Sequence, residues 1–153
     1  MKRTVSIVTG CFNEAENMRE FYDRCRAAVR ACGEDFDYEF VVADNGSTDG
    51  TREILRAIAS EDKKFRVIMN SKNFGHIRSP FHALLNASGD LVFYICSDLQ
   101  EPPEILPDFV AKIDEGCSVV AGVRTGAEGS RWMELVRRAY YCLLRKMAPD
   151  QGL

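Results

Sequence analysis

Short apolar runs alternate with longer stretches of helical periodicity from the beginning of the chain. Residues 4–9 are rich in β-branched side chains and stop at a glycine, which predicts a strand. Apolar residues then recur at helical spacing from about Ala15, after Asn13 as the expected N-cap and before Gly33 as the expected stop. The chain is therefore expected to begin with a strand followed by a long amphipathic helix.

The same alternation continues to residue 123. Ser79 followed by Pro80 is typical of an N-cap and a first helical residue, so a helix is expected from there to about Ser88. Asp49 is expected to cap the helix after Gly50 rather than to contact a ligand. Further strands are predicted over residues 38–43, 65–69, 91–96 and 118–123, and a further helix between Pro102 and Gly116.

Strands that alternate with helices predict an α/β fold with an open, mainly parallel sheet, helices on both faces and right-handed crossovers. A chain of 153 residues is long enough for one compact core. Ligands of such sheets bind beyond the carboxyl ends of the strands. This rule selects three loops, at residues 10–17, 44–50 and 97–103.

Composition narrows the choice of partner. The formal net charge of -3 gives no general attraction to nucleic acid, so we expect any anion to be bound locally. The six cysteines show no metal-site spacing and are expected to be reduced and mostly buried. The first apolar run is too short for an export signal and nothing approaches the roughly 18 apolar residues of a membrane span, so we expect a cytoplasmic protein.

Two carboxylates follow predicted strands. Asp44 is placed to accept a hydrogen bond from a nucleobase or ribose, or else to hold the Asn45–Gly46 corner as an Asx-turn. Asp98 is placed to bind a hard divalent cation whose other ligands are water and diphosphate oxygens. Its alternative role, as cap of the helix at Pro102, is weakened by the intervening residues.

A basic loop follows the third predicted strand. Lys72, His76 and Arg78 surround Gly75, which permits close approach of a ligand to the backbone. Cations in such a loop suit phosphate. His82, on a helix face, is expected to be structural.

These residues resemble the motifs of the family 2 glycosyltransferases, in the order and at the spacing of that family. The matching runs are Cys11–Glu14, Asp44–Thr51, Asn73–His76, Gly89–Asp90 and Asp98–Pro103. The resemblance covers about residues 4–124 and implies a GT-A fold, a nucleotide diphosphate sugar donor, a divalent metal (Mg²⁺ or Mn²⁺) and inversion at the anomeric carbon.

The resemblance also implies roles for single residues. Phe12 and Glu14 would line the base and ribose pocket, with Asp44 against the nucleobase or ribose and Asp90 near the nucleoside. Asn73, Gly75 and His76 would bind the substrate, and Lys72 is expected to join them as a cation suited to phosphate. Asp98 would bind the metal, and both Asp98 and Gln100, which would face the sugar, would act in catalysis.

Three positions depart from the family pattern. Gly10 replaces a proline, Asn45 replaces a second aspartate, and Cys96 replaces the first carboxylate of the aspartate-any-aspartate motif. A thiol is a poor ligand for magnesium, so Cys96 is expected to be a packed strand residue. Metal binding would then depend on Asp98 and the substrate.

The motifs most resemble the polyprenyl-phosphate subgroup, which includes dolichol-phosphate mannose synthase and bactoprenol glucosyltransferase. We therefore expect a nucleotide-sugar-binding core over 1–124, and over 125–153 a basic amphipathic helix and the start of a C-terminal region, with the acceptor segment missing. Residues 131–147 hold five basic residues and one acid, which suits either contact with anionic lipid or packing on the sheet.

The leading hypothesis is an inverting glycosyltransferase that moves a sugar to a polyprenyl phosphate, or another lipid or glycan acceptor, at the cytosolic face of a membrane. A phosphate acceptor is already anionic and needs no strong general base. One alternative is a nucleotide-binding or scaffold protein without turnover. A nucleotidyltransferase is less favoured because the loop at residues 10–17 contains no lysine.

Overall fold

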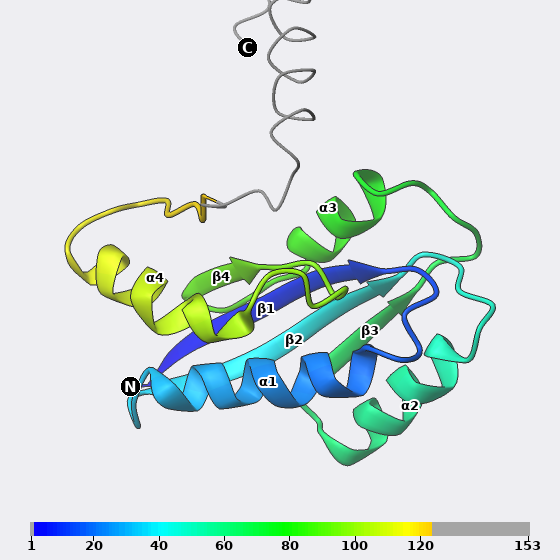
Figure 1. The fold of residues 1–153 in the computed structure, drawn as a ribbon, viewed down its shortest axis with the longest axis horizontal. Helices are drawn as coiled ribbons and strands as arrows, with labels where there is room; N and C mark the ends of the chain where they lie inside the picture. The colour runs from blue at the N-terminus through cyan, green and yellow to red at the C-terminus, as the bar shows by residue number, and fades with distance from the viewer. Residues whose placement is uncertain (1, 124–153) are drawn as a thin grey trace, which may run out of the picture. The chain divides into compact units, whose positions relative to one another are not determined.

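Four parallel strands form a sheet in the order β3-β2-β1-β4 (Figure 1). The computed structural model describes residues 2–123. The strands are β1 (Arg3–Cys11), β2 (Phe36–Asp44), β3 (Phe65–Met69) and β4 (Leu91–Tyr94). All pairings in the sheet are parallel, which agrees with the nearly continuous apolar run predicted for a strand buried on both faces.

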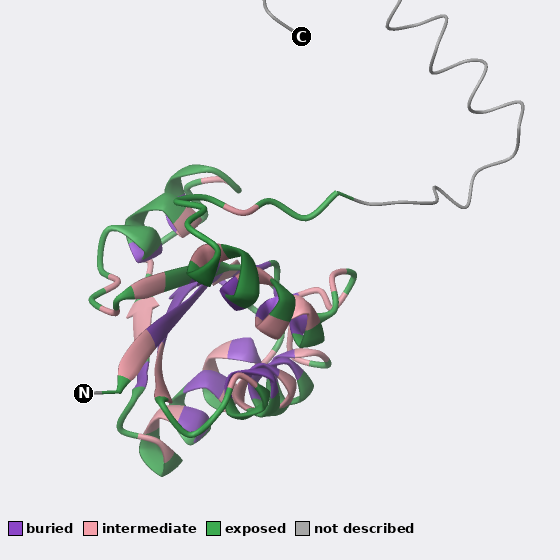
Figure 2. Cartoon of the chain, turned by 90° about the vertical axis from the view of Figure 1, so that its left-hand side faces the viewer, coloured by how far each residue is buried: buried purple, intermediate pink, exposed green. Residues whose placement is uncertain are grey.

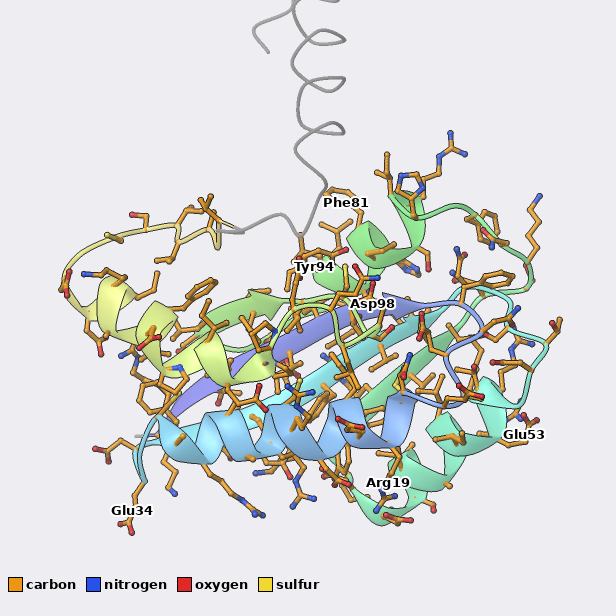
Figure 3. The ribbon with its side chains drawn as sticks, in the orientation of Figure 1. Arg19, Glu34, Glu53, Phe81, Tyr94 and Asp98 are labelled. Carbon is orange, nitrogen blue, oxygen red and sulfur yellow. The ribbon has the colours of Figure 1, made fainter. Side chains whose placement is uncertain are left out.

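Helices cover both faces of this sheet. They are α1 (Met18–Ala31), α2 (Thr51–Glu61), α3 (Arg78–Leu84), the short 3-10 turn η1 (Pro103–Ile105) and α4 (Leu106–Asp114). Helices α1, α2 and α4 lie on one face and α3 on the other (Figure 1). In Figure 3, Phe81 of α3 and Tyr94 of β4 accordingly lie on one side of the sheet, and Arg19 and Glu53 on the other.

The larger hydrophobic core lies under α1. Its apolar stripe includes Met18, Phe21 and Cys25, all completely buried, and packs on Phe40 of β2. The smaller core, between the sheet and α3, contains Val8, Val41, Ala43 and Ala83. Figure 2 shows buried residues concentrated in the strands and in the helix sides that face them. The α/β prediction with helices on both faces is therefore confirmed.

Two predicted helix starts were wrong. Asn13 does not cap α1, because its backbone is left-handed with φ 56° and the helix begins only at Met18. Ser79 lies inside α3, whose N-cap is Ile77, and α3 ends at Leu84 rather than near Ser88. In both places a polar side chain that suits an N-cap is used for a contact with another loop instead.

The last predicted strand is also absent from the structure. Residues 118–123 form no strand, although they follow α4 and Gly116, which ends that helix with φ 103°. Among the described helices none is long and apolar enough to cross a membrane. The predicted boundary at residue 124 and the helix over 131–147 lie outside the described residues.

Candidate active site

The carboxyl ends of β1, β2 and β4 meet at one edge of the sheet. Cys11, at the end of β1, pairs with Asp44, at the end of β2, and Tyr94 ends β4 beside Val8. β2, which ends at Asp44, and β4, which precedes Asp98, are separated only by β1, so these two strands lie roughly 10 Å apart. The two acidic turns therefore follow strand ends at the same edge, as the sequence predicted.

The turns after β1 and β2 are joined by hydrogen bonds. The Asn13 amide donates to Ser47 Oγ at 2.9 Å, and Asn13 Oδ1 accepts from the Thr48 amide at 2.9 Å. The Glu14 amide donates to Thr51 Oγ1 at 2.9 Å. The side chains of Ser47 and Thr51 thus fix one loop to the other.

Asp49 belongs to the same set of contacts. Its Oδ1 accepts from the backbone amide and the hydroxyl of Thr51, the first residue of α2, and its Oδ2 accepts from the Ala15 amide. The N-cap itself is Gly50, with φ 98°. Asp49 therefore stabilises the start of α2 from the preceding position, close to the predicted role.

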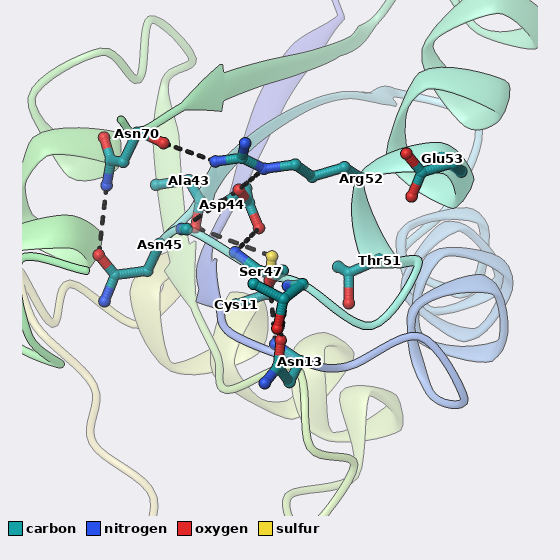
Figure 4. A network of polar contacts seen from close by, with 12 residues as sticks. Cys11, Asn13, Ala43, Asp44, Asn45, Ser47, Thr51, Arg52, Glu53 and Asn70 are labelled. Carbon is teal, nitrogen blue, oxygen red and sulfur yellow. Dashed lines mark hydrogen bonds and ion pairs between the residues drawn. The ribbon is translucent and has the colours of Figure 1, made fainter. Parts of the chain in front are cut away.

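Asp44 lies completely buried beneath these turns (Figure 4). Its carboxylate accepts hydrogen bonds from Arg52 Nε at 2.6 Å, from the Ser47 amide at 3.2 Å and from the Gly46 amide at 3.3 Å. Burial raises the pKa of this carboxyl, but the hydrogen bonds from Ser47 and Arg52 outweigh burial and leave the pKa below its usual range. Asp44 is thus an ionised support for the loop, and direct contact with a nucleoside requires it to exchange these partners.

A cavity of about 360 Å³ opens at the same edge of the sheet. Its walls come from the ends of β1 and β4, the turns after β2 and β3, and the first turn of α3. The lining residues are Gly10, Cys11, Phe12, Asn45, Asn73, Gly75, His76, Ser79, Pro80, Tyr94 and Cys96. The structure therefore brings together four of the predicted substrate-binding residues: Phe12, Asn73, Gly75 and His76.

Glu14 and Lys72 lie close to this group without lining the cavity. Glu14 Oε2 accepts a hydrogen bond from Asn17 at 2.8 Å, at the start of α1. The Lys72 ammonium lies 5.3 Å from the centre of the exposed Phe74 ring, a cation–π distance. Both side chains are therefore held by neighbours within their own loops.

Asp98 and Gln100 lie in the segment after β4. Asp98 is half-buried and its Oδ1 accepts from the Gln100 amide at 3.1 Å, while Gln100 itself is exposed. Between them Leu99 has φ 58°, and Asn13 is the other described non-glycine residue with a positive φ. Strained backbone in two loops at the ligand-binding edge is typical of functional sites.

The position of Cys96 differs from the sequence prediction. It was expected to pack within a strand, but β4 ends at Tyr94 and Cys96 is exposed on the cavity wall. Burial and the nearby Cys96 raise the pKa of the Tyr94 hydroxyl, which stays protonated at neutral pH. Cys11, on the same wall, is buried, and burial raises the pKa of its thiol to about 12, so it serves as a small packing residue.

Asp90 lies at the amino ends of the strands, opposite the end where the cavity opens. Its Oδ2 accepts from the Thr4 amide at 2.8 Å, beside the first residues of β1 and β4. The four residues of β4 separate it from the carboxyl edge, a distance of roughly 13 Å. The structure therefore does not bring Asp90 to the other candidates, and its position gives no support to a nucleoside contact.

Close packing against Pro80 explains why position 10 is a glycine. A Cβ added at Gly10 would lie 2.7 Å from Cγ of Pro80, a rigid ring in the first turn of α3. The proline of most family members at this position would meet the same ring. Gly10 and Pro80 are thus sterically matched, and the smallest residue here lets α3 approach β1.

Few of the described side chains near the cavity could bind a metal ion. Among residues 2–123 no three His, Cys, Asp or Glu side chains are grouped closely enough to hold an ion. The single half-buried carboxylate of Asp98 fits a hard cation only when the ligand supplies further oxygens. The thiol of Cys96 is a soft donor and contributes little to such a site.

Sequence reasoning missed several residues of the cavity. Ser79 and Pro80 were assigned to a helix cap, Tyr94 to the interior of a strand, and Asn45 only to a departure from the family pattern. Alternation along β4 carried a usable signal, because Phe93 is buried toward α4 and its neighbour Tyr94 must therefore face the side of α3. The other positions depend on contacts between distant loops.

Comparison with known proteins gives sequence relatives and structural neighbours. The chain is 33% identical to an undecaprenyl-phosphate 4-deoxy-4-formamido-L-arabinose transferase of Enterobacter sp. (strain 638), over 97% of this chain and 46% of that protein. It is 31% identical to the transferase of the same name from Salmonella paratyphi A, over 94% of this chain and 44% of that protein. The chain thus spans less than half the length of these relatives.

Solved structures agree in fold. Staphylococcus aureus TarS 1-349 in complex with UDP matches 75% of this chain and 32% of its own, with 28% identity and a TM-score of 0.58. Glucosyl-3-phosphoglycerate synthase of Mycobacterium tuberculosis matches 98% and 53%, with 27% identity and a TM-score of 0.59. The model of the family described as Glycosyl transferase family 2 matches residues 6–148, and the chain therefore belongs to that family.

Proposed function

We propose that this chain binds a nucleotide diphosphate sugar at the carboxyl edge of its sheet, as the donor half of an inverting glycosyltransferase whose acceptor is a polyprenyl phosphate. The observation that carries the proposal is the cavity between the ends of β2 and β4, with Phe12, His76 and Cys96 in its walls. The sequence relatives, named as undecaprenyl-phosphate transferases, support the acceptor class.

The residues of the cavity suggest which part of the donor each contacts. Phe12, exposed to 46%, offers an aromatic face for stacking on a base. The turn at Asn73–His76 offers backbone at Gly75, where φ is 90°, and the imidazole of His76 for phosphate oxygens. Asp98 would hold Mg²⁺ or Mn²⁺, and Gln100 would face the sugar.

The metal has a limited part in this proposal. A bound divalent cation would offset charge on the departing nucleotide diphosphate. One neighbouring structure, the mannosyltransferase PcManGT of Pyrobaculum calidifontis, is described in complex with GDP-Man and Mn²⁺. In this chain the carboxylate of Asp98 is the residue expected to hold such an ion.

Titration calorimetry tests donor binding. The chain is titrated with UDP, GDP and their sugar conjugates, with and without Mn²⁺. We expect one nucleotide class to bind, and to bind more tightly with Mn²⁺. The absence of binding to both classes under all conditions would contradict the proposal.

Cys96 favours a second candidate, a nucleotide-binding protein without turnover. A thiol at the first position of the metal motif leaves Asp98 as the main protein ligand. The variant Cys96→Asp separates the two. If the variant gains Mn²⁺ affinity and begins to hydrolyse the donor, the natural site binds metal weakly, which favours the protein without turnover. If Mn²⁺ affinity and donor hydrolysis stay unchanged, the metal-assisted transferase is favoured.

A further inference from the structure

The side-chain amide of Asn45 joins the end of β2 to the turn after β3. Its Nδ2 donates to Asn73 Oδ1 at 2.9 Å and to the Gly75 carbonyl at 3.2 Å, and its Oδ1 accepts from the Phe74 amide at 2.8 Å. A longer contact of 3.4 Å joins Asn70 Nδ2 to the same Oδ1. Two donated and two accepted hydrogen bonds use the full capacity of a primary amide.

Every one of these partners belongs to residues 70–75. Asn45 is 5% exposed, so its polar atoms depend on this turn rather than on water. Asn73 Oδ1, held by Asn45, accepts in turn from the Gly75 amide at 2.8 Å. The side chain of one residue thus fixes the backbone of the turn that forms one wall of the cavity.

The backbones of the two loops are also in close contact. A Cβ added at Gly46, where φ is 86°, would lie 3.0 Å from the Asn73 nitrogen and 3.0 Å from the Lys72 carbonyl carbon. The outer side of the network is closed by Arg52, whose Nη2 donates to the Asn70 carbonyl at 2.6 Å, and by Asn70 Nδ2, which donates to Ser79 Oγ at 2.9 Å. Figure 4 shows Asn45 and Asn70 beside the Asp44–Arg52 pair.

We infer that Asn45 is a positioning residue that holds the Asn73–His76 wall in its ligand-binding geometry before the nucleotide diphosphate arrives. The inference rests on the proposed donor site and deepens it. Preorganised donors lower the cost of ordering on binding, so loss of the amide should weaken the ligand even where Asn45 does not touch it. An aspartate at position 45 cannot replace it, because a carboxylate would oppose Asn73 Oδ1 and the Gly75 carbonyl.

The variant Asn45→Asp tests this inference, because it keeps the shape and removes both donated hydrogen bonds. The matched control is Asn86→Asp, which changes charge equally and removes an amide hydrogen bond to the His82 carbonyl outside the cavity. Amide hydrogen exchange at Gly75 reports on the turn directly, without ligand. Calorimetry with UDP or GDP, whichever binds, and Mn²⁺ reports on the site.

We expect faster exchange at Gly75 and about tenfold weaker nucleotide affinity in Asn45→Asp, on the scale of one or two lost hydrogen bonds, with neither change in Asn86→Asp. The affinity deficit should shrink toward pH 5, because the introduced carboxyl faces two acceptors and regains a donor when protonated. A purely structural defect would not follow pH in this way.

A second variant guards against simple misfolding. Gly46→Ala leaves the Asn45 amide intact and displaces the turn through its backbone, so it should also weaken nucleotide affinity. Wild-type exchange at Gly75 and wild-type affinity in Asn45→Asp would overturn the inference, as would an equal loss in Asn86→Asp. If the unmodified chain binds neither nucleotide, the proposed function fails, and exchange at Gly75 alone still decides whether Asn45 holds the turn.

Discussion

The two acidic turns at the ligand-binding edge differ in how they are supported. In the turn after β2 Asp44 is completely buried, and its carboxylate accepts hydrogen bonds from Arg52 and two backbone amides. In the turn after β4 Asp98 is half-buried and accepts one described hydrogen bond, from the Gln100 amide. Asp44 therefore serves the fold first, while Asp98 has coordination capacity left for a ligand.

This difference shows that a carboxylate that follows a strand can either support its own loop or remain available for a ligand. Parallel strands bring both aspartates to the same ends of the strands, but the hydrogen-bond donors within and just after each turn decide which carboxylate is already occupied. Stability is expected to depend on the β2 turn, and metal-assisted binding on the β4 turn. Substitutions in the two turns should separate these properties.

The largest expected effect follows from Asp98→Asn. Loss of the metal carboxylate should reduce Mn²⁺-dependent nucleotide affinity by about 100-fold, the upper range for disturbed metal sites. Removing Mn²⁺ from the unmodified chain should have a similar effect, and the thermal midpoint should hardly change. Calorimetry with and without Mn²⁺ measures this, and an unchanged affinity would exclude Asp98 as the metal ligand.

Asp44→Asn should act on stability instead. The variant weakens a charge-assisted contact with Arg52 that is buried on the Asp44 side, and because Arg52 is 29% exposed the loss is expected to be about 2 kcal/mol. Chemical denaturation measures the free energy of unfolding. A change below about 0.5 kcal/mol would show that the network does not stabilise the fold.

Gly10→Ala should cost about 1–2 kcal/mol, because the new methyl group meets the Pro80 ring and neither side can move freely. The same denaturation experiment detects it. Combining Gly10→Ala with Pro80→Ala should recover part of the loss, and an absence of recovery would contradict the steric match between these residues.

The smallest and most gradual effect concerns pH. The pKa values of Asp44 and Glu39 are lowered in the folded chain, where hydrogen bonds from Ser47 and Arg52, and from Ser6 and Ser88, outweigh burial. Their stabilisation is present above the unfolded pKa values of about 4 and is lost as pH falls through the folded values. The free energy of unfolding should decline below about pH 4, and less steeply in Asp44→Asn.

Much of the fold could be predicted from local pattern. The apolar run at 38–43 indicated a strand buried on both faces, and β2 occupies an interior position in the sheet. The missing strand at 118–123 had the composition of a strand, but strands form only where a partner is available to hydrogen-bond them. Composition alone could not show that Val119 and Val123 remain exposed.

The sequence could predict that the candidate site lies at the carboxyl ends of the strands, but not which side chains contact one another there. The topological rule selected the loops at 10–17, 44–50 and 97–103, and residues of the first two line the cavity. It could not show that Asn45 hydrogen-bonds residues 70–75, because such pairings depend on which loops the sheet brings together. Asp90 was placed near the nucleoside by the resemblance alone, although it directly precedes the strand predicted at 91–96 and so lies at the amino end of that strand.

Nuclear magnetic resonance of backbone amides, with UDP or GDP added in the presence of Mg²⁺, tests the location of the donor site most directly. The account requires chemical-shift changes at Phe12, at Gly75 and His76, and around Asp98 and Gln100, with the amino edge near Thr4 and Asp90 unaffected. Shifts confined to the amino edge, or none with either nucleotide, would contradict it.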